Sequence, residues 1–106
     1  MLLGFRNVEF ALSDNVNEPL NLISLAKSGT GEVQAVPQTD FKVQVLVEPQ
    51  PLVLESDVWL LVLEGDLIID LPHGDFRTLK RGDSLRLEAS LKATLTPLEE
   101  TVILQQ

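Results

Sequence analysis

The sequence predicts an all-β domain, either a small sandwich or a barrel. Short stretches of alternating apolar residues recur along the chain, and clusters of glycine, proline and aspartate separate them, a spacing typical of antiparallel sheets. A chain of 106 residues suits one compact domain and buries roughly two-thirds of its unfolded surface. We therefore expect one domain over residues 1–106, with an N-terminal segment over about 1–31 and the barrel over about 32–106.

The N-terminal segment is predicted to hold one strand and one short helix. Residues 5–12 alternate well enough for a strand. Asn17 would cap a helix with Pro19 in its first turn, and Ser28-Gly29 would end it. Leu20, Ile23 and Leu25 would then face the core. A strand over residues 20–25 is the alternative that the pattern leaves open.

From residue 32 onward the apolar residues recur with a period of two. Residues 41–47 alternate as in a half-buried strand, with Lys42 and Gln44 on the solvent side. Pro49 and Pro51 indicate a loop or an edge strand, because proline cannot donate a hydrogen bond to a neighbouring strand. Residues 58–63 are apolar on both faces, which predicts a central strand. Further strands are expected over residues 67–71, 76–79, 85–87, 91–95 and 102–104, with turns at 64–66, 72–75, 80–83 and 97–100.

Composition excludes several classes of function. The 16 acidic and 8 basic residues give a net charge of −8, which repels nucleic-acid phosphates and anionic lipid heads, so neither is an expected partner. The chain has no cysteine and one histidine, which rules out thiolate metal sites and multi-histidine sites within one chain. The longest apolar run, Val58 to Leu63, is far shorter than the roughly twenty residues of a membrane span. The N-terminus turns polar too soon for a signal peptide, and we expect a cytoplasmic protein.

Two motifs resemble conserved boxes of the cupin superfamily. The stretch Val58-Trp59-Leu60-Leu61-Val62-Leu63-Glu64-Gly65-Asp66 resembles the first box. Thr78-Leu79-Lys80-Arg81-Gly82-Asp83-Ser84-Leu85 resembles the opening of the second, one hairpin further along. The resemblance covers residues of about 41–105 and implies a small single-domain cupin with a jelly-roll barrel, the double-stranded β-helix. Because cupins frequently dimerise through edge strands, it also implies a homodimer.

The metal chemistry of the superfamily does not carry over to this sequence. Cupins that bind metal place a histidine pair before the first box, a glutamate inside it and a histidine in the second box. The glutamate position falls on Val58 and the last histidine on Ala93, and the histidine pair falls on Leu52 and Leu54 or, one residue earlier, on Pro51 and Val53. None of these side chains has a lone pair for a metal ion, so no metal and no cofactor is expected.

The resemblance therefore favours a metal-free module that binds a small apolar or weakly polar molecule, or has a structural or interaction role, over an enzyme. The barrel-lining candidates for binding are Leu52, Leu54, Trp59 and Ala93. Trp59 suits core packing, a dimer interface or ligand stacking.

The alternative is a cupin enzyme of the isomerase, epimerase or dioxygenase type with a non-standard site. Such an enzyme would work either with side chains alone or with a divalent metal held by carboxylates, the candidates being Glu48, Glu55 and Asp57. An epimerase working with side chains alone needs a histidine or tyrosine acid–base pair. The absence of tyrosine and the single histidine argue against that version.

Overall fold

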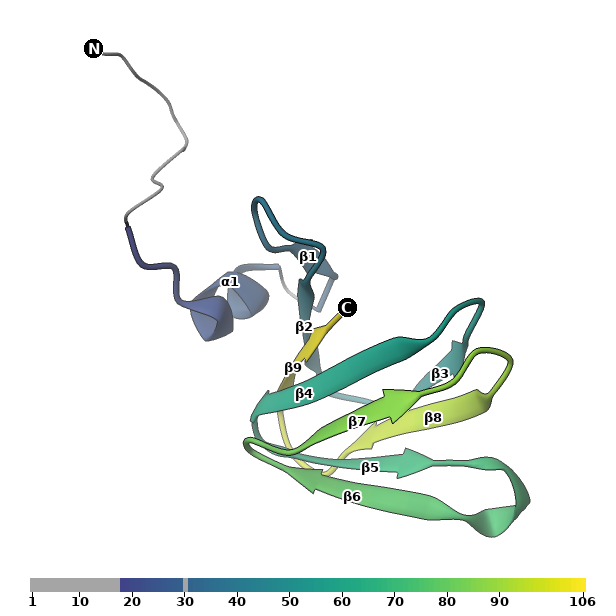
Figure 1. The fold of residues 1–106 in the computed structure, drawn as a ribbon. Helices are drawn as coiled ribbons and strands as arrows, with labels where there is room; N and C mark the ends of the chain where they lie inside the picture. Colours follow the sequence, from purple (N-terminus) through teal and green to yellow (C-terminus); the bar gives the residue numbers. More distant parts are fainter. Residues whose placement is uncertain (1–17, 30) are drawn as a thin grey trace.

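The computed structural model describes residues 18–29 and 31–106, which form one short helix and two antiparallel sheets (Figure 1). The expected all-β jelly roll with a short N-terminal helix is confirmed. The strand predicted over residues 5–12 lies outside the described residues. The elements are α1 (Leu22–Ser28), β1 (Gln34–Ala35), β2 (Lys42–Leu46), β3 (Gln50–Val53), β4 (Val58–Glu64), β5 (Asp66–Asp70), the 3-10 turn η3 (Pro72–Gly74), β6 (Phe76–Lys80), β7 (Ser84–Leu87), β8 (Lys92–Pro97) and β9 (Thr101–Gln105).

The helix begins later than the sequence indicated. Asn17 lies outside the described residues, and the cap is Asn21, whose side chain accepts a hydrogen bond from the Ser24 amide at 3.0 Å. Leu20 therefore precedes α1 and is exposed, contrary to the prediction that it faces the core. The end at Ser28, with Gly29 as the following cap, is confirmed. With 7 residues, α1 is the only described α-helix, and no described helix is long and apolar enough to span a bilayer.

The strands form a five-stranded sheet in the order β1-β2-β9-β4-β7 and a four-stranded sheet in the order β3-β8-β5-β6. From β2 to β9 the chain passes from one sheet to the other at almost every step, so the sheets face each other as a sandwich (Figure 1). β3 is an edge strand of its sheet, as its proline at position 51 predicted.

Two hydrophobic clusters lie on opposite faces of the five-stranded sheet. The interior cluster fills the space between the sheets and contains Leu46, Leu54, Leu60, Val62, Leu67, Ile69, Leu79, Leu87, Ala93, Leu95 and Ile103. The helix-side cluster lies under α1 and contains Ala26, Val36, Val43, Val45, Val102 and Leu104. β4 contributes to both clusters, with Leu60 and Val62 inside and Trp59 and Leu61 on the helix side. The predicted central strand with two covered faces is therefore confirmed.

The prediction that β2 is only half buried is wrong. Val43 and Val45 face the helix-side cluster, while Leu46 belongs to the interior cluster. Gln44, expected on the solvent side, is only 6% exposed. The reason is that α1 packs over one face of β2, while the other face looks toward the second sheet.

Candidate functional site

The positions that the resemblance assigned to metal ligands meet between the sheets. Leu54 and Ala93 belong to the interior cluster, and Leu52 and Val58 pack against it half-buried. Leu52 pairs directly with Ala93 across β3 and β8. The other assignment of the histidine pair, one residue earlier on Pro51 and Val53, is excluded, because Val53 is 73% exposed on the outer face.

This part of the interior does not fit a metal ion. Every residue of the interior cluster is aliphatic, and leucine, valine and alanine offer no lone pair. Leu60, Val62, Leu67 and Ile69 are 0% exposed, so the middle of the sandwich is packed by its own side chains.

The carboxylates of the alternative metal hypothesis are not brought together as a site. Asp57 accepts hydrogen bonds from the Ala89 amide at 2.8 Å and from the Arg86 guanidinium. The Ala89 amide, and then Arg86, lower the pKa of Asp57 below its ordinary value. Glu48 and Glu55 are exposed, and within residues 18–29 and 31–106 no three histidine, cysteine or acidic side chains cluster as a metal site would require.

The structure does not place Trp59 with the other barrel-lining candidates. It is half-buried in the helix-side cluster, where its ring meets Phe41 edge-to-face at a centroid distance of 6.3 Å. The prediction that Trp59 lines the barrel beside Leu52, Leu54 and Ala93 is therefore wrong. The reason is strand alternation, because Val58 and Leu60 take the interior face and turn Trp59 to the helix side.

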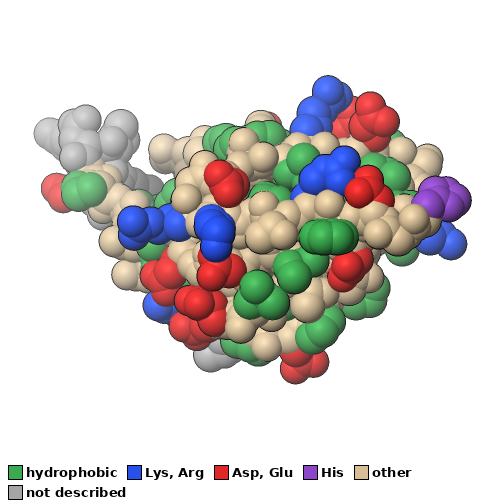
Figure 2. Space-filling model, turned by 90° about the horizontal axis from the view of Figure 1, so that it is seen from below, with side chains coloured by type: hydrophobic (Ala, Val, Ile, Leu, Met, Phe, Trp, Pro, Cys, Tyr) green, Lys and Arg blue, Asp and Glu red, His purple; other side chains and the backbone are tan. Residues whose placement is uncertain are grey.

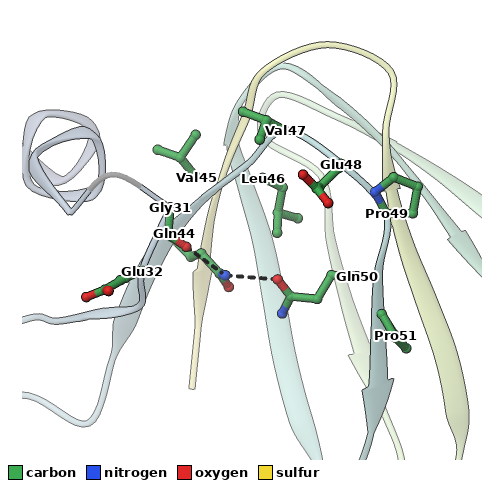
Figure 3. A pocket seen from close by; sticks show the side chains of 10 residues that line it. All are labelled: Gly31, Glu32, Gln44, Val45, Leu46, Val47, Glu48, Pro49, Gln50 and Pro51. Carbon is green, nitrogen blue, oxygen red and sulfur yellow. Dashed lines mark hydrogen bonds between the residues drawn. The ribbon is translucent and has the colours of Figure 1, made fainter.

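A cleft opens where the chain crosses from β2 to β3 (Figure 3), with a volume of about 440 Å³. Inside it, Gln44 Nε2 donates to Gln50 Oε1 at 3.0 Å and to the Gly31 carbonyl at 3.3 Å. Because Gln44 lies on β2 and Gln50 on β3, the first bond joins the two sheets. We call this region the glutamine cleft, lined by Gly31, Glu32, Gln44, Val45, Leu46, Val47, Glu48, Pro49, Gln50 and Pro51.

The glutamine cleft combines amides, acids and apolar walls. Gln44 and Gln50 supply amide donors and acceptors, and Glu32 and Glu48 are the charged residues of the lining. Neither lysine nor arginine lines it, so the cleft disfavours anionic ligands.

The alternation in the sequence does not indicate this cleft. Gln44 alternates with valines, and alternation alone assigned it to a solvent face. The available signal was the short separation between Gln44 and Gln50 across Pro49, which does not by itself show that the two strands enter different sheets.

A few exposed apolar side chains lie outside both clusters. Phe76 on the edge strand β6 is 56% exposed, and Leu98 after β8 is 60% exposed. Figure 2, viewed from the side of β5 and β6, shows hydrophobic side chains scattered among acidic and basic ones. The expected homodimer therefore stays a prediction.

Comparison with known proteins identifies the fold. No family model and no curated protein matches the sequence. A protein from Neisseria meningitidis is 19% identical with a TM-score of 0.67, over 83% of this chain and 97% of that one. A cupin-2 domain protein from Shewanella frigidimarina is 18% identical with a TM-score of 0.63, over 81% and 90% of the two chains.

The similarity extends to an enzyme. Hydroquinone 1,2-dioxygenase from Sphingomonas, solved with 4-hydroxybenzoate bound, is 14% identical with a TM-score of 0.72, over 81% of this chain and 71% of that one. At these identities the likeness concerns the fold. The chain has a small cupin fold, as the two motifs predicted.

Proposed function

We propose that this protein is a metal-free cupin-fold module that binds a small uncharged or cationic molecule in the glutamine cleft. The observation that carries the proposal is the buried Gln44. Its neighbours in the same row across the sheet, Ile103 and Val62, are both aliphatic and 0% exposed. Burying an amide among them costs free energy unless its hydrogen bonds are made, and a leucine there would pack without that cost.

The cleft is a better candidate than the metal position of other cupins. That position is occupied by Leu52, Leu54, Val58 and Ala93, whose aliphatic side chains pack against one another. The glutamine cleft offers an open volume and polar groups that can orient a ligand, the combination typical of small-molecule sites.

The competing hypothesis is an enzyme with a carboxylate-bound divalent metal. It requires Glu48, Glu55 and Asp57 to converge, whereas Asp57 is engaged with Arg86 and Ala89. Elemental analysis of protein purified without an affinity tag, before and after dialysis against chelator, separates the two hypotheses. Near-stoichiometric metal that resists washing would favour the enzyme.

The binding proposal is tested by adding neutral and cationic fragments to isotope-labelled protein and following side-chain amide signals by NMR. We expect binders to shift the signals of Gln44 and Gln50. The variant Gln44→Leu should remain folded, because leucine suits the aliphatic row, and should lose this binding. Gln106→Leu is the matched control, because Gln106 is exposed and its described hydrogen bonds, to Trp59, use only its backbone. Binding that is equal in wild type and Gln44→Leu would refute the proposal.

A further inference from the structure

The hydrogen-bonding capacity of the glutamine pair is only partly used. Two amide groups placed side by side can exchange two hydrogen bonds, but here only Gln44 Nε2 donates to Gln50 Oε1. The same nitrogen also reaches the Gly31 carbonyl, so both of its donor hydrogens are engaged. Among the residues that the structure describes, Gln44 Oε1 has no donor and Gln50 Nε2 has no acceptor.

The two remaining groups belong to side chains that line the same cleft. Figure 3 shows the two amides pointing toward each other, joined by the dashed bond. Gln44 is 6% exposed, so the residue is largely withdrawn from bulk water. A polar group that is buried in this way and left without a hydrogen bond costs free energy. A ligand that carries one donor next to one acceptor would satisfy both groups together.

We propose, resting on the function proposed above, that the cleft recognises the cis-amide edge of a small neutral molecule such as a lactam, a cyclic urea or a primary amide. The ligand N–H donates to Gln44 Oε1, and the adjacent carbonyl accepts from Gln50 Nε2. The apolar parts of Val47, Pro49 and Pro51 line the same cleft and suit a compact hydrocarbon ring. Glu32 and Glu48 select against ligands that carry a phosphate or carboxylate.

The test compares 2-pyrrolidinone with N-methyl-2-pyrrolidinone, which has the same ring and carbonyl but lacks the N–H. Each is titrated into isotope-labelled protein, and the side-chain amide signals of Gln44 and Gln50 are followed. We expect saturable shifts with the first compound and binding at least about fivefold weaker with the second, the factor expected when a buried acceptor is left without its donor. Gln50→Leu and Gln44→Leu should each weaken 2-pyrrolidinone binding similarly, and Gln106→Leu should not.

The outcomes distinguish this inference from the proposed function. If cationic or other fragments shift the two glutamines while both pyrrolidinones do not, or if the two pyrrolidinones bind equally, the cis-amide inference is wrong and the cleft is still a binding site. If no compound shifts either glutamine, both proposals are overturned.

Discussion

Gly65, which joins β4 to β5, is the position where a single methyl group should do most damage. Its φ of +95° lies in the left-handed region, and the pairing of β4 with β9 slips beside it, between Val62 and Glu64. A Cβ placed on Gly65 would lie 2.6 Å from the Glu100 carbonyl oxygen and 2.6 Å from Thr101 Oγ1. Because the carbonyl belongs to the backbone, the steric clash made by Gly65→Ala cannot be relieved by rotating one flexible side chain.

The cost of Gly65→Ala has two parts. Holding alanine at a positive φ costs about 1–2 kcal/mol. Displacing Thr101, which is 0% exposed and whose hydroxyl lies 2.9 Å from the carbonyl oxygens of Asp66 and Glu99, costs roughly 1–3 kcal/mol if its hydrogen bonding is lost. We therefore expect the free energy of unfolding to fall by about 2–5 kcal/mol.

Gly82→Ala is the matched control, because Gly82 also has a positive φ, +92°, but an added Cβ would meet nothing within 4 Å. It should cost only the backbone part, about 1–2 kcal/mol. Urea unfolding followed by the fluorescence of Trp59, which sits half-buried against Phe41, measures both variants. If the two variants differed by less than about 0.5 kcal/mol, within the scatter of ordinary surface substitutions, the close approach would have no energetic weight and the reasoning would be refuted.

Three further predictions concern charge, packing and assembly. Asp57→Asn should lower stability at neutral pH. Folding lowers the pKa of Asp57, so its contribution to the free energy of unfolding is present above about pH 4 and is lost as the pH falls through the lowered value. The difference in stability between variant and wild type should therefore narrow in acid denaturation curves. Leu60→Ala, in the 0% exposed interior, should cost about 2–5 kcal/mol in the same urea assay, and a cost below about 1 kcal/mol would contradict the packed interior. Light scattering after size-exclusion chromatography should show a homodimer, with Phe76→Glu weakening it if β6 is the contact; a monomer at high micromolar concentration would remove that prediction.

Most strands and turns could be predicted from local pattern. The alternation in β8, the breaks at Gly65 and Pro72, and the doubly apolar β4 all reflect constraints that act within a few residues. The helix was also predictable, but its start was not. Asn17 and Asn21 are both suitable caps by residue type, and the observed cap is Asn21, bonded to the Ser24 amide.

The candidate site depended on contacts between distant segments. Alternation shows that Gln44 and Leu46 share one face of β2, but it does not show which faces of the strand are covered. Because α1 packs over the other face and β3 enters the opposite sheet, both faces of β2 are enclosed, and Gln44 meets Gln50 across the sandwich.

The sequence by itself determined the all-β class, the two cupin-like motifs and the aliphatic character of the positions where metal-binding cupins hold their metal. These depend on residue type and spacing along one strand. Only the tertiary structure decided that Trp59 faces the helix, that Asp57 is engaged by Arg86 and Ala89, and that two glutamines line a cleft between the sheets. The physical reason is that burial and hydrogen-bond partners are set by the pairing of segments remote in sequence, which a local pattern does not encode.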